Sequence, residues 1–136
     1  MVETMARRTH LTYACLSVLL APACAEEPSG APPSVEDLAL TPMTVAVGST
    51  TQVQGSLHFT DPDADVRDLE ITLTPPAGAA ATVELAIAGA DGKIEADTTF
   101  ILAITAPQAG DYEVKVVLID AEGHESDASV ATVTAQ

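Results

Sequence analysis

The sequence contains few positively charged and few aromatic residues. Five Lys and Arg residues stand against 20 Asp and Glu residues, for a formal net charge of −15, and there are two Phe, two Tyr and no Trp. Such a charge repels phosphate backbones and anionic lipid headgroups, so we expect no nucleic-acid binding and no electrostatic adhesion to membranes. The scarcity of aromatic residues also disfavours a carbohydrate-binding module. The negative charge favours cations or a basic protein as binding partners.

The sequence also lacks the motifs of the common catalytic sites. A nucleophile elbow, a phosphate-binding loop, a Cys/His pair and a His-Glu-x-x-His helix are all missing. Paired carboxylates are present, but they make a hydrolase only where a cleft raises the pKa of one of them. We therefore predict that the protein is not an enzyme. Zinc is also disfavoured, because His58 and His124 are the only histidines outside the N-terminal segment and no thiolate is expected beside them.

The N-terminal segment has the layout of a bacterial export signal. Arg7 and Arg8 precede a mostly apolar stretch over residues 11–21, and small residues follow it. The apolar stretch is too short to span a bilayer, which needs about 20 residues. The segment is therefore read as a cleaved signal peptide, with Met1 or Met5 as its start.

The signal ends in a cysteine. Residues 20–24, Leu-Ala-Pro-Ala-Cys, resemble the lipobox of bacterial lipoproteins, which implies that Cys24 is lipidated, with palmitate among its acyl chains, and becomes the mature N-terminus. Ala25 resembles the residue that sorts such proteins to the outer membrane. Ordinary secretion is the alternative, since Ala23-Cys24-Ala25 is also a small-x-small cleavage site. The only other cysteine, Cys15, would leave with the signal peptide, so no disulfide is expected within the mature chain.

We divide the chain into three parts: a signal peptide over residues 1–23, a lipidated Cys24 with a Pro/Gly/Ser-rich tether over 24–36, and one domain over 37–136. Removal of the signal leaves 19 acidic and three basic residues. The expected location is the cell envelope, at the outer membrane, and the domain is expected to be a monomer.

The domain is predicted to be all β, because the hydrophobic pattern has period two and is interrupted at regular intervals by Gly, Pro or Asp. No stretch has a helical period. Residues 51, 53, 55, 57 and 59, for example, share one face, and polar residues occupy the other. Seven strands are expected, near residues 38–47, 51–59, 69–73, 83–87, 94–104, 112–118 and 128–134. The first is interrupted at Thr41-Pro42, where proline removes a ladder donor and marks an edge or a switch between sheets.

Three short motifs carry a resemblance to a known fold family. Residues 60–65 read Thr-Asp-Pro-Asp-Ala-Asp, residues 109–114 read Ala-Gly-Asp-Tyr-Glu-Val, and residues 120–126 read Asp-Ala-Glu-Gly-His-Glu-Ser. Their order and spacing resemble bacterial immunoglobulin-like domains of the PKD and cadherin-like kind. The resemblance implies a seven-stranded antiparallel sandwich. It also places Tyr112 at a tyrosine corner, with one further core aromatic as the alternative.

Antiparallel strand order gathers the acidic loops at one end of such a sandwich. The loops near residues 60–65, 89–92 and 120–127 alternate with loops that contain no acid. Asp61, Asp63, Asp65, Asp120 and Glu122 are therefore the candidate ligands of a calcium ion, since extracellular modules bind calcium through loop oxygens at ~0.1–1 mM. The alternative is that these residues occupy solvated turns and cap their own backbone.

Two functions are compatible with these features. The first is a non-catalytic binding or adhesion module displayed on the envelope, which should show an exposed apolar patch or an uncovered strand edge. The second is a structural or assembly subunit of an envelope complex, with a basic partner for the acidic end.

Overall fold

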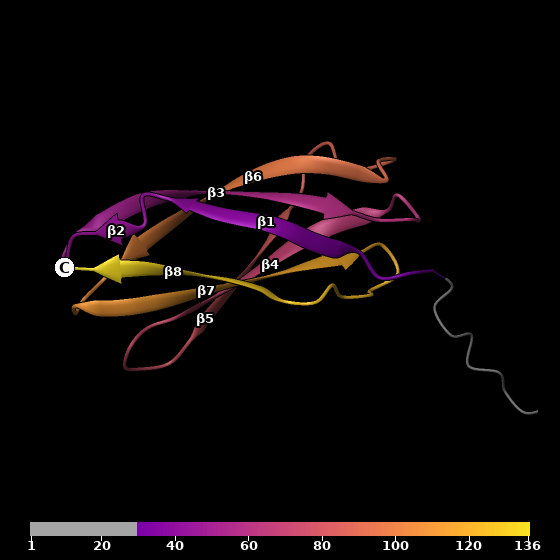
Figure 1. Ribbon diagram of the computed structural model, residues 1–136. Coiled ribbons are helices and arrows are strands. Elements are labelled where there is room, and N and C mark those ends of the chain that lie inside the picture. Colours follow the sequence, from indigo (N-terminus) through magenta and orange to yellow (C-terminus); the bar gives the residue numbers. More distant parts are fainter. Residues whose placement is uncertain (1–29) are drawn as a thin grey trace, which may run out of the picture.

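Two β-sheets face each other in the computed structural model, which describes residues 30–136 (Figure 1). The first sheet has the order β1-β3-β6 and the second the order β2-β8-β7-β4-β5. The strands are β1 (Ser34–Thr41), β2 (Thr44–Val45), β3 (Thr50–Thr60), β4 (Val66–Thr74), β5 (Ala81–Ala86), β6 (Glu95–Thr105), β7 (Gly110–Asp120) and β8 (Ser129–Ala135). The predicted signal peptide, Cys24 and residues 25–29 of the tether lie outside the described residues.

The prediction of an all-β sandwich is confirmed, but the count of seven strands was wrong. The segment expected as one strand is two, because it leaves the first sheet after Thr41 and joins β8 in the second sheet at Thr44. Pro42 stands at this change of sheet, as predicted. β1 also begins at Ser34, so it includes three residues of the predicted tether. None of the described segments is a helix that could cross a membrane.

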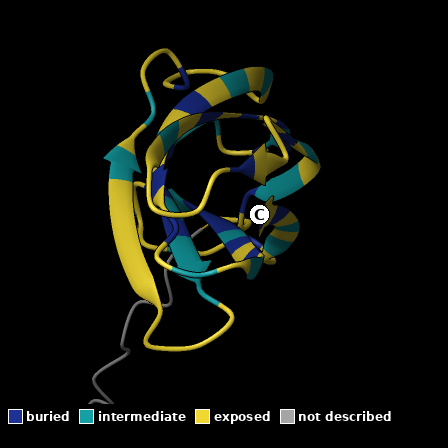
Figure 2. Ribbon diagram, turned by 90° about the vertical axis from the view of Figure 1, so that its left-hand side faces the viewer, coloured by how far each residue is buried: buried dark blue, intermediate teal, exposed yellow. Residues whose placement is uncertain are grey.

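Alternation along the long strands builds the core. Every second residue of β3 from Val53 to Phe59 is buried, and β7 buries Tyr112, Val114, Val116 and Leu118 in the same way. Figure 2, an end-on view, shows buried and exposed residues alternating along most of the strands. The central pairs β3–β6 and β4–β7 run antiparallel over almost their whole length.

Tyr112 forms the tyrosine corner. Its side chain is 1% exposed, and its hydroxyl donates a 3.0 Å hydrogen bond to the carbonyl oxygen of Gln108, four residues upstream. A buried tyrosine that bonds back to the chain at the start of this strand is a mark of immunoglobulin-like sandwiches. The change of sheet after Thr41 and the distribution of strands between the sheets agree with that class.

The loops separate into two poles, as predicted. At one pole, whose loops contain no acidic residue, the loops after β2, β4 and β6 meet: Gly48 N donates to Ala106 O, and Gln108 Nε2 donates to Ala77 O. At the other, which we call the acidic pole, the loops after β3, β5 and β7 meet. There Asp61 N donates to Ile94 O, Gly92 N to Ala64 O, and Ala121 N to Asp65 O.

Candidate functional site

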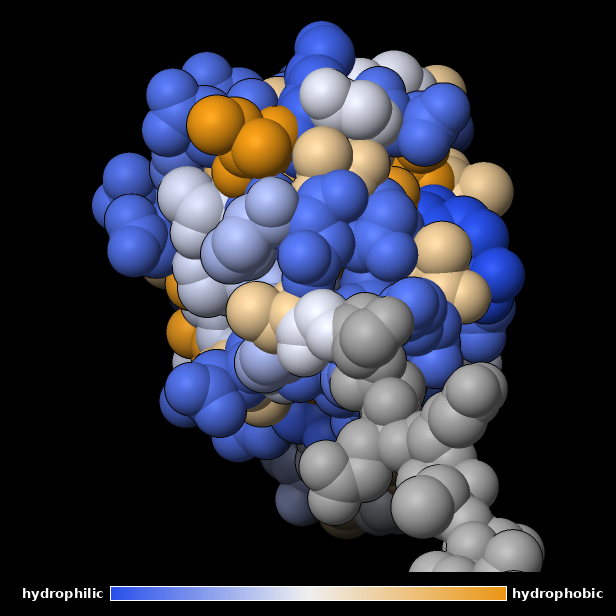
Figure 3. Space-filling view, turned by 90° about the vertical axis from the view of Figure 1, so that its right-hand side faces the viewer, coloured by the Kyte–Doolittle hydropathy of each residue, from blue (hydrophilic) through white to orange (hydrophobic). Residues whose placement is uncertain are grey.

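Two regions of the described chain are candidates for function: the acidic pole and a groove along one open side of the sandwich. Figure 3 looks onto the end of the molecule at which the described chain begins, and hydrophilic side chains cover most of the visible face. Gly30, the first described residue, lies at this acidic pole. A Cβ on Gly30 would stand 2.7 Å from Asp63 Oδ2 and 3.2 Å from Glu122 Oε2.

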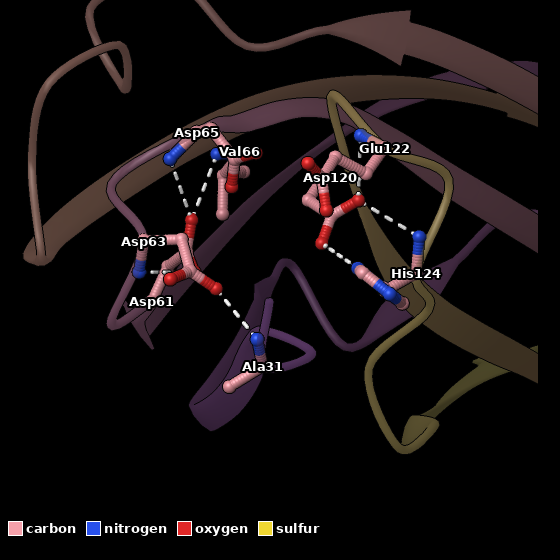
Figure 4. A network of polar contacts seen from close by, with 8 residues as sticks. All are labelled: Ala31, Asp61, Asp63, Asp65, Val66, Asp120, Glu122 and His124. Carbon is pink, nitrogen blue, oxygen red and sulfur yellow. Dashed lines mark hydrogen bonds and ion pairs between the residues drawn. The ribbon is translucent and has the colours of Figure 1, made fainter. Parts of the chain in front are cut away.

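Asp61 organises the loop between β3 and β4. Its side chain is fully buried, and its carboxylate accepts hydrogen bonds from the main-chain N–H groups of Asp63 (3.2 Å), Asp65 (2.7 Å) and Val66 (3.0 Å). Figure 4 shows these bonds converging on one carboxylate. Asp61 therefore caps its own loop, as Asp side chains do in tight turns.

Asp120 does the same in the loop between β7 and β8. It is 1% exposed, and its Oδ1 accepts from the main-chain N–H groups of Glu122 (2.9 Å) and His124 (2.8 Å), while its Oδ2 lies 2.6 Å from His124 Nδ1. Burial alone would raise the pKa of Asp120, but its hydrogen bonds with His124 and Glu122 hold that pKa below its ordinary value.

Asp65 belongs to the loop that Asp61 caps, and its carbonyl oxygen accepts from Ala121 N of the neighbouring loop. Its Oδ1 is buried and has no hydrogen-bond partner among the described residues. Burial raises the pKa of Asp65, and so do its contact with the Asp61 carboxyl and the charges of Asp120, Asp61 and Asp63. The folded protein therefore binds a proton at Asp65 more tightly than the unfolded chain does.

The structure brings the five predicted calcium ligands to one pole but gives three of them other partners. Asp61 and Asp120 bond to main-chain N–H groups, and Asp63 accepts from Ala31 N. Within residues 30–136 no group of three or more His, Cys, Asp and Glu side chains is placed to hold a metal ion. Calcium binding therefore stays a prediction.

Replacement of Asp65 by asparagine tests this prediction and the pKa together. Ionisation of Asp65 opposes folding, so its contribution lowers stability as the pH rises above 3.8, the ordinary pKa. At pH 7 without calcium, D65N is expected to melt at a higher temperature than the wild type. If calcium binds with a Kd of ~0.1–1 mM, 10 mM calcium should stabilise the wild type by about 2 kcal/mol and D65N by less.

Thermal melts of both proteins with calcium and with EDTA provide the measurement, and magnesium provides the control ion. Equal melting curves of the wild type with and without calcium would contradict the calcium site. A D65N protein less stable than the wild type at pH 7 would contradict the raised pKa.

The second region is the groove, which the sequence did not reveal. It has a volume of about 520 Å³ and lies between β6 and the paired strands β4 and β5. Apolar side chains form much of its lining, with polar groups on the β6 side. The lining residues are Leu69, Leu85, Ala86, Ile87, Ala88, Asp97, Thr98, Thr99, Phe100 and Ile101.

The groove exists because the two sheets differ in width. β6 is the last strand of a three-stranded sheet, whereas the opposite sheet continues from β4 to β5. The inward face of β5 therefore extends beyond the edge of the three-stranded sheet. Its apolar residues stay partly or largely accessible: Val83 is 41% exposed, and Leu85 is only half-buried.

The sequence matches no known family profile and no curated protein. Solved structures resemble the fold. The alkylpurine DNA glycosylase AlkC of Pseudomonas fluorescens aligns with a TM-score of 0.50 at 16% identity, over 79% of this chain and 31% of the glycosylase. A PKD domain from an M14-like peptidase of a Thermoplasmatales archaeon aligns at 20% identity over 76% of this chain and 92% of that domain, with a TM-score of 0.41.

A Niemann-Pick type C2 protein from the Japanese carpenter ant aligns at 12% identity over 81% of this chain and 98% of its own, with a TM-score of 0.49. At these identities the likeness extends to the sandwich fold alone. This chain spans less than a third of the glycosylase, so nothing of that enzyme's activity comes with the resemblance.

Proposed function

We propose that this protein is a non-catalytic envelope lipoprotein that presents an immunoglobulin-like binding module. The observation that carries the binding function is the groove of about 520 Å³ beside an uncovered strand. An apolar hollow with a few polar groups at its side is a common form of binding site. The export signal and Cys24 support the location, and the alternative of ordinary secretion differs only in the missing anchor.

A second candidate function is an assembly subunit of an envelope complex with a basic partner. Its support is the acidic pole, where Asp63, Glu122 and the two buried carboxylates of Asp61 and Asp120 lie together. The two candidates differ in the surface that a partner would cover: the groove in the first and the acidic pole in the second.

Substitution of Cys24 tests the anchor. The wild type is expected to incorporate labelled palmitate and to sediment with outer membranes, whereas Cys24→Ser should lose the label and leave the membrane fraction. Cys15→Ser is the matched control, because Cys15 would be removed with the signal peptide. Labelled Cys24→Ser protein, or unprocessed wild type in the cytosol, would contradict the proposal.

The binding function is tested by affinity capture from detergent-solubilised envelopes with the tagged, processed protein. A specific partner that protects the groove residues from chemical labelling would support the binding module. A partner that protects the acidic pole instead would favour the assembly subunit.

A further inference from the structure

We propose that the groove accepts an extended strand from a basic partner, which pairs with the open edge of β6 and completes the first sheet. This inference rests on the proposed binding function and specifies its partner. Three observations support it: an unprotected strand edge, an apolar floor that one more strand would cover, and acidic rims.

The outer edge of β6 carries no partner strand among residues 30–136. Of the described strands only β3 pairs with β6, so every second residue of β6 directs its main-chain N–H and C=O groups away from the sheet. Residues 98–105, Thr-Thr-Phe-Ile-Leu-Ala-Ile-Thr, contain no charge, proline or glycine, and Ile101 is 64% exposed. Natural edge strands are usually short, charged or bulged, because a long apolar edge is a template for strand addition.

The other edge of the same sheet shows the contrast. β1 has a register irregularity between Glu36 and Ala39, and Asp37 within it has a φ of 54°. A bulge of this kind is a device that prevents pairing. The sheet thus protects one edge and leaves the other open.

The floor of the groove fits the side chains of an added strand. A strand beside β6 would lie above the inward face of β5 and cover Leu85 and Ile87, while Phe100 lines the inner wall. Alternate side chains of that strand would point into the groove and should be apolar. A small apolar ligand could occupy the floor, but it would leave the polar groups of the β6 edge unpaired.

The rims of the groove indicate the charge of the partner. Asp97, whose side chain is 90% exposed, and Glu95 lie on the outer face of β6, and Glu84 lies on the outer face of β5 directly opposite Glu70 of β4. Like charges in opposed positions destabilise a sheet, and a cationic neighbour relieves them. The outward side chains of the partner strand should therefore be Lys or Arg. A second copy of this chain would bring the same acids and meet repulsion.

Three basic residues stand near the rims: His58 Nδ1 lies 2.9 Å from Asp97 Oδ1, Arg67 of β4 is under the charge of Glu84, and Lys93 is the third. Lys93 lies in the loop before β6, close to the acidic pole, and it lines a smaller hollow with Ala88 and Asp97. The lining of the groove along residues 98–101 contains no basic side chain. Basic residues of the partner are thus expected over this section.

A nine-residue peptide that alternates Val and Lys is the probe, with an alternating Val and Asp peptide as its control. The protein is the full processed chain, purified from membranes in detergent, and the readout is hydrogen exchange over residues 95–105 together with the dissociation constant. The Val/Lys peptide should bind and slow the exchange of β6, and the Val/Asp peptide should do neither. Reversal of both rim charges, in E84K/D97K, should weaken binding about tenfold. A single charge reversal at Glu113, exposed on β7 and outside the groove, should alter binding less than about twofold.

Absence of β6 protection, protection at the acidic pole instead, or equal binding by E84K/D97K would overturn the inference. So would a concentration-dependent dimer that protects β6 without peptide, or displacement of the peptide by a small apolar ligand. The proposed function is tested separately by envelope capture. If the wild type and E84K/D97K capture the same partner without β6 protection, the binding function stands and the strand inference fails. If the wild type captures nothing, the proposed function itself fails.

Discussion

Replacement of Asp61 by alanine is expected to lower the free energy of unfolding by about 3–5 kcal/mol, because three main-chain N–H groups lose their acceptor at once. Hydrogen bonds to a charged group contribute about 1.5–3 kcal/mol each, and a buried donor left without a partner costs about 1–3 kcal/mol. Not all of this is lost, since the hydrogen bond from the N–H of Asp63 is only partly buried and one negative charge leaves the pole. The loss is still a large part of the stability of a small domain, which is typically about 5–15 kcal/mol.

Urea unfolding of Asp61→Ala, Asp61→Asn and Asp63→Ala provides the measurement. Asn keeps one acceptor oxygen, so Asp61→Asn should lie between the wild type and Asp61→Ala. Asp63→Ala is the matched control: it removes an exposed carboxylate from the same loop and should cost less than about 1 kcal/mol. Similar stabilities for Asp61→Ala and Asp63→Ala would show that the capping bonds contribute little.

A methyl group at Gly55 is expected to destabilise the fold by about 3 kcal/mol, at the upper end of the range for overpacked cores. Gly55 pairs with Phe100 across β3 and β6, and the ring of Phe100 lies directly over it. A Cβ on Gly55 would be 2.0 Å from Phe100 Cζ, closer than any real contact, so the ring or the strand must move. Phe100 is also in the wall of the groove, so the same change should distort that site.

A double-mutant cycle isolates this clash from other effects of the substitution. Phe100→Ala alone should cost about 3–5 kcal/mol by opening a cavity. Adding Gly55→Ala to Phe100→Ala should then cost less than about 0.5 kcal/mol, because the obstructing ring is gone. Ser56→Ala, at the exposed neighbouring position, should be close to neutral. An equal cost of Gly55→Ala with and without the ring would contradict the clash.

The sequence predicted the strands well where one face is buried and the other is exposed. In β3 and β7 the alternation of apolar and polar residues is almost complete, so period and burial agree. It predicted the boundaries of the first strand poorly, because Pro42 signals an interruption without saying that the chain changes sheets. The acidic pole followed from antiparallel order alone.

The roles of the acidic residues were less predictable. Asp61 and Asp63 are two positions apart in a turn, and nothing local distinguishes the buried residue from the exposed one. That difference depends on contacts with residues far along the chain, such as Ile94, whose carbonyl receives the N–H of Asp61. The groove was not predictable for a similar reason: β5 and β6 read as ordinary strands, and only the widths of the two sheets leave them uncovered.

The position of Gly30 has a consequence for orientation. With a lipid on Cys24, six residue steps connect the bilayer to the first described residue, a span of at most about 20 Å. The end of the body nearest the bilayer is then the one that carries the carboxylates, and it is repelled by anionic headgroups within about one Debye length, ~8 Å. The strands run from this end to the other (Figure 1), so they would stand roughly perpendicular to the membrane. The open edge of β6 would then face proteins that lie beside it on the same membrane.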